Sequence, residues 1–283
     1  MTLATNPLPH PEARPRFGLI VVGDEILSGK RVDKHLAHTI GLLGARGLQL
    51  DYAHFVGDDP QRITQTLKDG FASGDVVFST GGIGATPDDH TRQCAARALG
   101  VELALHPVAK TLILERMQEL ARDKGEPYLP ERDDNVHRLQ MGVFPVGAQI
   151  IPNPYNKIPG FSCAGSGAGS IHFVPGFPVM AWPMVAWVLD THYAAWFTQD
   201  AWIEHSVIVM GAMEATLTPL MVSIEQSHAV KVFSLPSVDH PDYGRHIELG
   251  VKGAPAAVEP AFAALRAGLQ TFTLQLGPEL VRK

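Results

Sequence analysis

Three apolar runs, each followed by a segment with helical periodicity, constrain the fold of this chain more than any other feature. The runs cover residues 17–23, 48–57 and 75–80. The first and third are almost continuously apolar, which is typical of central strands covered on both faces. Strands that alternate with helices of ten to fifteen residues indicate βαβ units. We therefore predict an α/β fold with a three-layer, doubly wound and mainly parallel sheet.

Local signals place the helices between these strands. Asp59-Pro60 is expected to begin one helix, because Asp is a good N-cap and Pro suits the first helical position. After the third run, a helix is predicted from about Pro87 to Ala98, ended by Gly100. Another helix is predicted from about residue 108 to residue 122.

The second half of the chain is less regular. Residues 141–161 alternate short apolar runs with Pro and Gly, which predicts a hairpin and loops that fold back over the sheet. Residues 170–178 predict a strand, a tight turn and the start of a Trp-bearing helix. Beyond residue 200 the pattern restarts with strand 206–211, helix 214–226, strands 231–237 and 246–253, and helix 255–270.

This pattern predicts three parts of the chain. Residues 1–15 are proline-rich and are expected to form a flexible tail. Residues 16–198 are expected to form the large α/β domain, and residues 199–283 a small α+β domain. The polar residues of the small domain match no catalytic pattern, so packing or oligomer contacts are its expected role.

Composition and charge limit the class of partner. The 283 residues carry a formal net charge of −6 and contain no basic block, so nucleic-acid binding is not expected. The N-terminus lacks the apolar core of a signal peptide, and the apolar stretch 179–197 is interrupted by Pro183 and Asp190. No membrane insertion is therefore expected, and we predict a cytoplasmic protein that binds a small molecule.

The third apolar run ends at Thr80 and is followed by Gly81, Gly82 and Gly84. Glycine has no Cβ, so backbone N–H groups here can approach a ligand closely. The first turn of the following helix also has free N–H groups and a positive dipole end, which favour a phosphate. A tight strand-to-helix turn needs glycine even without a ligand, so both interpretations stay open. The spacing fits neither GxGxxG nor a Walker loop.

Two aspartates follow these glycines. Thr86 fits an N-cap, Pro87 fits the first helical position, and Asp89 can reach back to Thr86 in a capping box. Asp88 is not needed for that box. We therefore favour Asp88 over Asp89 as the functional carboxylate.

Acidic residues also follow the first two strands, as Asp24-Glu25 and Asp58-Asp59. The carboxyl ends of parallel strands meet at one edge of a sheet, so these carboxylates should lie near one another. Asp59 is explained as an N-cap, whereas Asp58 and Glu25 are not. Together with Asp88 they are candidate ligands for Mg²⁺ or another divalent cation that also binds substrate phosphates. Neither a zinc-binding His pattern nor a GxSxG nucleophile is present.

The segments "GDEILSG", "VGDD", "STGGIGATPDD", "IPNP", "IPGF" and "VPGFP" together resemble the molybdopterin-binding (MoaB/Mog-like) domain. The form they match stands at the N-terminus of the competence/damage-inducible protein A (CinA) family. The resemblance covers roughly residues 16–190, and the small domain resembles the one that follows in that family. It implies a homo-oligomer with molybdopterin or a nucleotide as ligand. The chain ends without the family's amidase domain, so deamidation of nicotinamide mononucleotide is not expected.

The resemblance also implies a ligand site. The acidic position of the TPDD motif falls on Asp88 or Asp89, and that of VGDD falls on Asp58. The implied ligand- and phosphate-binding residues are Gly23, Thr80, Gly81, Gly82, Gly84, Thr86, Asn153, Pro175, Gly176 and Pro178. The implied catalytic residues are Asp58, Asp88 and Asp89, and the candidate metal ligands are Asp58, Asp88 and Glu25.

The chain departs from the family pattern at three places. Ala85 stands where the family usually has proline, and Lys34-His35 stands where an Asn is common. Phe177 replaces a small or polar residue of the PG.P turn, so its ring is expected to narrow a pterin slot.

Three functions fit these patterns. The first is a protein that binds a pterin or nucleotide phosphate on the glycine loop without turning it over, and it requires least of the sequence. The second is a metal-dependent hydrolase of nucleotide diphosphates such as ADP-ribose or FAD, an activity associated with relatives of this domain. There the metal would polarise the diphosphate and activate water, and glycine N–H groups would stabilise developing charge. The third is a non-catalytic oligomeric scaffold.

Overall fold

The computed structural model describes residues 14–198 and 202–282. The chain divides into a large unit, Met1–Gly44 with Leu48–Phe197, and a small unit, Ala45–Gly47 with Thr198–Lys283. Residues 1–13 of the predicted tail lie outside the described residues.

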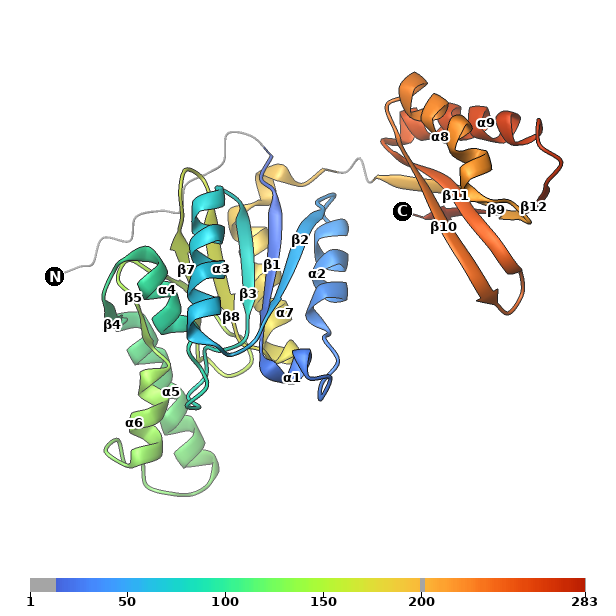
Figure 1. Ribbon diagram of the computed structural model, residues 1–283. Coiled ribbons are helices and arrows are strands. Elements are labelled where there is room, and N and C mark those ends of the chain that lie inside the picture. Colours follow the sequence, from blue (N-terminus) through green and yellow to red (C-terminus); the bar gives the residue numbers. More distant parts are fainter. Residues whose placement is uncertain (1–13, 199–201, 283) are drawn as a thin grey trace. The chain divides into compact units, whose positions relative to one another are not determined.

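A six-stranded sheet forms the centre of the large unit, in the order β2-β1-β3-β8-β7-β6 (Figure 1). Neighbouring strands among the first four are parallel, whereas β7 and β6 are antiparallel to the strands beside them. The prediction of a mainly parallel α/β sheet is therefore confirmed. The strands are β1 (Phe17–Val22), β2 (Leu50–Val56), β3 (Val76–Thr80), β6 (Gln149–Ile151), β7 (Gly160–Ala164) and β8 (Ser170–Val174).

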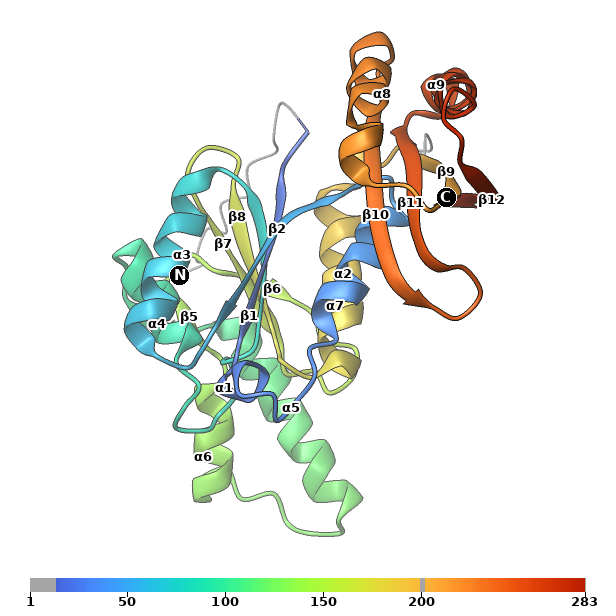
Figure 2. The ribbon, with the colours of Figure 1, turned by 45° about the vertical axis from the view of Figure 1, so that its right-hand side comes forward.

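Helices cover both faces of this sheet (Figures 1 and 2). They are α1 (Asp24–Leu27), α2 (His35–Gly44), α3 (Pro60–Ser73), α4 (Thr91–Leu99), α5 (Pro107–Asp123), α6 (Asp133–Gln140) and α7 (Pro178–His192), followed by the 3-10 turn η1 (Ala194–Trp196). Alternate strand residues supply two separate cores: Ile20 packs with α3, α4 and α5, whereas Leu19 packs with α2 and α7. Each fully buried Leu, Ile or Phe side chain contributes roughly 1.5–3 kcal/mol to folding.

The stretch 141–161 contains the antiparallel β6–β7 hairpin, in agreement with the prediction. It does not fold back over the sheet, because both strands extend the sheet at its edge. Within the same stretch, before the hairpin, β5 (Val143–Pro145) pairs with β4 (Leu103–Leu105) in a separate two-stranded sheet.

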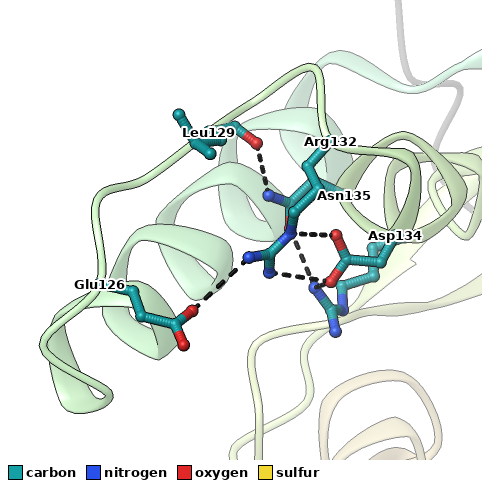
Figure 3. Close-up of polar contacts among 6 residues, drawn as sticks. Glu126, Leu129, Arg132, Asp134 and Asn135 are labelled. Atoms are coloured by element: carbon teal, nitrogen blue, oxygen red, sulfur yellow. Dashed lines mark hydrogen bonds and ion pairs between the residues drawn. The ribbon is translucent and has the colours of Figure 1, made fainter.

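Helix α6 is absent from the sequence prediction, and a polar network stabilises its start (Figure 3). The Arg132 guanidinium donates to Asp134 at 2.5 and 3.0 Å and lies 3.5 Å from Glu126. Its hydrogen bonds lower the pKa of Asp134 to about 2. The Asn135 amide donates to the Leu129 carbonyl at 2.7 Å. These contacts order the α5–α6 connection, where the sequence has few apolar residues.

The small unit has the element order β-α-β-β-α-β, with strand order β10-β11-β9-β12 and antiparallel neighbours throughout. This is the ferredoxin-like arrangement. Both helices lie on one face of the sheet (Figure 2), over a core that includes Val207, Leu249 and Phe262. The α+β prediction is confirmed, although strand β12 was not predicted. The elements are β9 (Ile203–Met210), α8 (Glu214–Ser227), β10 (Lys231–His240), β11 (Gly244–Gly253), α9 (Pro255–Leu269) and β12 (Gln275–Arg282).

No helix within residues 14–198 and 202–282 combines the length and apolarity that a bilayer crossing requires.

Candidate functional site

A cleft of about 400 Å³ opens in the large unit beside the carboxyl ends of β1, β2, β3 and β8. Its walls come from the segments that follow these four strands and from the β6–β7 loop. Ligands of doubly wound sheets bind at this edge. The predicted site residues that line the cleft are Gly23, Glu25, Asp58, Gly81, Gly82, Gly84, Thr86, Asp88, Asp89, Asn153, Pro175 and Gly176. The structure thus brings them together, and their roles in ligand binding stay a prediction.

Two predicted residues, Thr80 and Pro178, do not line this cleft. They line an adjoining cavity of about 430 Å³ on the α2 and α7 face of the sheet. Arg31, which the sequence analysis did not single out, lines both spaces. The sequence signal for it was the pair of cations Lys30-Arg31 directly after the "GDEILSG" segment.

The glycines after β3 are required by close packing. Gly81 and Gly82 have φ angles of +96° and +68°, which L residues with a side chain rarely adopt. A Cβ at Gly81 would collide with the Val22 carbonyl, and one at Gly82 would collide with the Thr91 hydroxyl. Thr91 in turn donates from its hydroxyl to the Gly81 carbonyl at 3.1 Å and from its N–H to the Gly82 carbonyl at 3.0 Å. The loop is therefore fixed between β1 and α4.

The backbone N–H groups of this loop divide into two kinds. The Gly81 N–H donates to the Val174 carbonyl at 3.1 Å, so it belongs to the sheet and cannot serve a ligand. Our prediction of a Gly81 N–H donor is therefore corrected. Among residues 14–198 and 202–282, the N–H groups of Gly82, Ile83, Gly84 and Ala85 have no backbone or side-chain acceptor. These four groups adjoin the cleft and form its potential anion seat.

A buried arginine supports the loop from below. Arg92 is 5% exposed, and its guanidinium donates to the Ile83 carbonyl at 2.5 Å. Burial lowers the pKa of Arg92, and the nearby Asp89 carboxylate opposes this shift. An arginine stays charged under these conditions, so positive charge lies directly behind the loop. The sequence carries no signal for this role of Arg92, because a single cation in a helix resembles a solvated residue.

The helix after the loop begins at Thr91 and not at Pro87. Residues 86–89 form a turn instead, in which the Asp89 N–H donates to the Thr86 carbonyl at 3.0 Å. The Asp89 carboxylate accepts from the Thr86 N–H at 2.8 Å and from its hydroxyl at 2.5 Å. The predicted reach of Asp89 back to Thr86 is therefore present, but it closes a turn before the helix. The unpaired N–H donors beside the cleft are therefore loop amides and not those of a helix N-terminus.

Asp58 has a structural partner that the sequence did not reveal. Its carboxylate accepts from the Asp24 N–H at 2.9 Å, and its own N–H donates to the Asp24 carboxylate at 3.1 Å. These reciprocal bonds join the segments after β1 and β2. The interpretation of Asp58 as a carboxylate without a structural role is therefore corrected.

Negative charge accumulates on this side of the cleft. Partial burial raises the pKa of Asp58, and the charges of Asp24, Glu25 and Asp88 raise it further against the effect of its backbone hydrogen bond. Asp88 is exposed, and the nearby polar side chain of Thr86 lowers its pKa, as does its own backbone N–H. The cleft thus combines unpaired N–H donors with a group of mutually repelling carboxylates.

The carboxylates fit a hard divalent cation by their chemistry but do not form a complete site. Among the described residues, no three His, Cys, Asp or Glu side chains are arranged to hold a metal ion. Asp58, Glu25 and Asp88 line one cleft and interact electrostatically. Mg²⁺ is usually bound by one or two carboxylates together with substrate phosphates and water. These residues therefore suit an ion that enters with a phosphate ligand.

Another part of the cleft lining comes from the β6–β7 loop. The Asn153 amide donates to Asn156 and to the Ile158 carbonyl at 2.8 and 2.9 Å, and its oxygen accepts from the Tyr155 N–H at 3.0 Å. The predicted ligand residue Asn153 thus uses its side chain to fold its own loop. Lys157 joins this loop to Glu115 and Glu119 of α5, at 3.3 and 2.5 Å.

Comparisons with known proteins identify the family of this chain. A family model described as "Probable molybdopterin binding domain" matches residues 18–193, which is more than half of the chain. A protein of Caldivirga maquilingensis is 28% identical over 218 residues, which cover 77% of this chain and 79% of that protein. A CinA-like protein of Geobacter sp. is 36% identical over 163 residues, or 58% of this chain. This chain spans only 37% of the length of that relative.

The solved structure of "protein CinA with unknown function" from Thermoplasma acidophilum has a TM-score of 0.52 and 27% identity to this chain. It covers 63% of this chain and 98% of its own. The family model, the CinA-like relative and this structure agree with the resemblance seen in the sequence. The chain therefore belongs to the molybdopterin-binding domain family, as a MoaB/Mog-like domain of the CinA type.

Proposed function

We propose that this chain binds a phosphate-bearing pterin or nucleotide in the cleft, with the phosphate on the N–H groups of residues 82–85. The observation that supports it is the set of backbone donors without acceptors, with the Arg92 charge behind them. Ile83 is buried, and Gly82 and Gly84 are half-buried. N–H groups shielded from water are rarely left unpaired, so a ligand that accepts from them gains free energy. The ligand is molybdopterin or a nucleotide, and the protein acts in the cytoplasm as a homo-oligomer, without nucleic-acid or membrane partners.

Phe177 supports a ligand with a planar ring. Its side chain lines the cleft and is 56% exposed, and the Arg31 guanidinium lies 6.0 Å from the ring centroid. An exposed aromatic face beside a cation favours stacking of a pterin or a purine. In the proposed complex, one face of the planar ligand stacks on the Phe177 ring, which forms part of the cleft wall.

A charge placed in the loop tests the proposal. Ala85 is exposed and lines the cleft, so Ala85→Glu puts a carboxylate beside the anion seat without disturbing the core. We expect ADP and ADP-ribose, measured by isothermal titration calorimetry, to bind this variant at least about tenfold more weakly than wild type. Ala72→Glu is the matched control, because Ala72 is exposed on α3 and does not line the cleft. Equal affinity in both variants would refute the loop as the phosphate site.

A second candidate function is metal-dependent cleavage of nucleotide diphosphates. The supporting observation is the charge cluster around Asp58, which a divalent cation would neutralise. Asp58, Glu25 and Asp88 would hold the ion together with ligand phosphates, and the ion would supply Lewis acidity at phosphorus. The incomplete arrangement of these three side chains places this candidate behind simple binding.

Product analysis separates the two candidates. ADP-ribose and FAD are incubated with the protein and Mg²⁺, Mn²⁺ or Co²⁺, and mononucleotide products are quantified. Hydrolysis requires turnover that Asp88→Asn abolishes while ADP-ribose binding persists. Binding without products under every metal leaves the first candidate alone.

A further inference from the structure

The cavity on the α2 and α7 face has a volume of about 430 Å³ and shares part of its lining with the cleft. The shared residues are Val22, Glu25, Arg31 and Gly176. The cavity thus adjoins the cleft at these shared residues. Its further lining consists of Val21, Ile26, Val32, Lys34, His35, Thr80 and Pro178.

Thr80 lines this cavity, and its side chain carries a buried hydroxyl without a hydrogen-bond partner among the described residues. Thr80 is the last residue of β3, is 1% exposed, and lies on the same face of the strand as Val76 and Phe78. Its Oγ1 makes no hydrogen bond with any of the described residues. Leaving a buried hydroxyl unpaired is unfavourable, so this position favours a ligand oxygen. The backbone of Thr80 is fixed by pairing with Val21 and Val174.

Two cations stand at the same cavity. Arg31 and Lys34 are exposed, and neither forms an ion pair with a carboxylate of the described residues. Glu25 is the only acidic residue among those that line the cavity. Asp33 lies nearby in the chain, but its two carboxylate oxygens accept from the N–H groups that begin α2. The lining therefore carries more positive than negative charge.

His35 fixes the geometry of the wall. It is 5% exposed, and its Nε2 lies 3.0 Å from the Gly176 carbonyl, which can only accept, so Nε2–H is the donor. This bond joins the start of α2 to the turn after β8. Arg31 and Lys34 are thus held on a segment that is anchored to both sides of the cavity.

We propose that this cavity is a second oxyanion subsite, in which Arg31, Lys34 and the Thr80 hydroxyl bind a phosphoryl group. It rests on the proposed function and extends it, because a ligand with two linked phosphoryl groups can place one on the glycine loop and the other here. Arg31, which lines both spaces, contacts both groups. The subsite selects ligands with two phosphates over ligands with one.

Inorganic phosphate is the probe, titrated at constant ionic strength and followed by calorimetry. The Ala85→Glu background weakens phosphate binding at the glycine loop, so the remaining signal reports the second cavity. In this background Arg31→Gln and Lys34→Gln are each expected to weaken phosphate binding at least about tenfold. Lys30→Gln is the matched control, because Lys30 is exposed in the same segment and lines neither space. Equal losses in all three variants would mean a general charge effect and overturn the subsite.

The Thr80 hydroxyl has its own test. Thr80→Val keeps the shape of the side chain and removes only the hydroxyl, so the protein should melt no lower than wild type when phosphate is absent. Phosphate affinity should fall about fivefold or more, and Thr80→Ser should restore part of it. Unchanged affinity in Thr80→Val contradicts the assignment of this hydroxyl and of the cavity.

Failure of the two proposals can be distinguished. If ADP fails to bind wild type but phosphate binding depends on Arg31 and Lys34, the proposed function is wrong and the subsite stands. If Ala85→Glu abolishes phosphate binding completely while Arg31→Gln and Lys34→Gln leave it intact in the wild-type background, phosphate binds only the glycine loop and the subsite is wrong.

Discussion

Two glycine-rich loops of the same sheet differ in what their N–H groups do. Residues 165–169 connect β7 to β8 at the end of the sheet away from the cleft, and the N–H groups of Gly165, Ser166 and Gly169 donate to protein carbonyls. The N–H groups of Gly167 and Ala168 have no acceptor among the described residues, but neither residue lines the cleft. In the loop after β3, four consecutive N–H groups, those of residues 82–85, have no acceptor among the described residues, and all four residues line the cleft. Glycine content alone therefore does not distinguish the two loops, whereas a run of unpaired N–H groups beside a cleft does.

The glycines of the two loops also serve different packing needs. A Cβ at Gly169 would press on the backbone of Gly74, and one at Gly165 on that of Phe71, so this end of the sheet is closed by the chain itself. A Cβ at Gly81 would meet the Val22 carbonyl, yet the space above the loop stays open. The loop after β3 thus combines close packing on one side with open space on the other, which is the arrangement expected of a ligand-binding loop.

Alanine substitution in each loop gives the largest expected difference. Gly81→Ala combines a φ of +96° with the clash against Val22 and should lower the free energy of unfolding by more than about 3 kcal/mol. Gly167→Ala has a φ of +57° but meets open space, so it should cost only about 1 kcal/mol. Urea unfolding followed by circular dichroism measures both. Similar costs would show that the loop after β3 is not tightly fixed.

A buried histidine on β8 should also control the stability of the protein in acid. His172 lies on β8 two residues beyond Ser170 and is fully buried, with Ser162 on Nδ1 at 2.7 Å and Tyr193 on Nε2 at 2.8 Å. Burial lowers its pKa to about 3, helped by His192. The unfolded chain therefore takes up the proton first as pH falls below about 6.5. Stability should decline by up to about 1.4 kcal/mol per pH unit between pH 6.5 and pH 3.

Urea midpoints at pH 6.5, 5.75 and 5.0 test this slope, before most carboxylates titrate. The stability of His172→Gln should depend less on pH than that of wild type, even if the variant is less stable at every pH. His137→Gln, at an exposed position on α6, should leave the slope unchanged. A slope that survives in His172→Gln would assign the acid sensitivity to another group.

The smallest expected change in stability concerns the charge of Asp58 at the cleft. The pKa of Asp58 is raised, so its ionised form is unfavourable in the folded protein, and the cost appears as pH rises through that pKa. Asp58→Asn keeps an acceptor for the Asp24 N–H and removes the charge. Solvent screening limits the expected gain at pH 7 to a few tenths of a kcal/mol. The gain should vanish on acidification, and a gain independent of pH would exclude charge repulsion as its cause.

Apolar runs and their periodicity were enough to predict the mainly parallel part of the large sheet, because buried strands and helical stripes carry strong local signals. They did not place the β6–β7 hairpin, which extends the sheet at its edge. Ile63, Leu67 and Phe71, spaced by four, are all buried on α3. Helix α6 and strand β12 lack such signals: α6 buries only Asn135, and β12 contains Gly277 and Pro278.

Site details depended on contacts that local sequence does not encode. The bond between Asp24 and Asp58 joins residues 34 positions apart. The side-chain bond from Asp89 to Thr86 is the same in a capping box and in a turn, so the sequence could not place the helix start at Thr91. The pairing of the Gly81 N–H with Val174 required the position of β8.

Asn153 and Lys157 fasten one part of the cleft lining, and Arg31 and Phe177 line the cleft with exposed side chains. We expect a ligand to enter past these two exposed side chains by their rotation, without a backbone hinge. Rotation of exposed side chains takes picoseconds to nanoseconds, far less than domain closure. We therefore expect side-chain rotamers to control ligand entry, while the backbone that forms the cleft keeps its conformation.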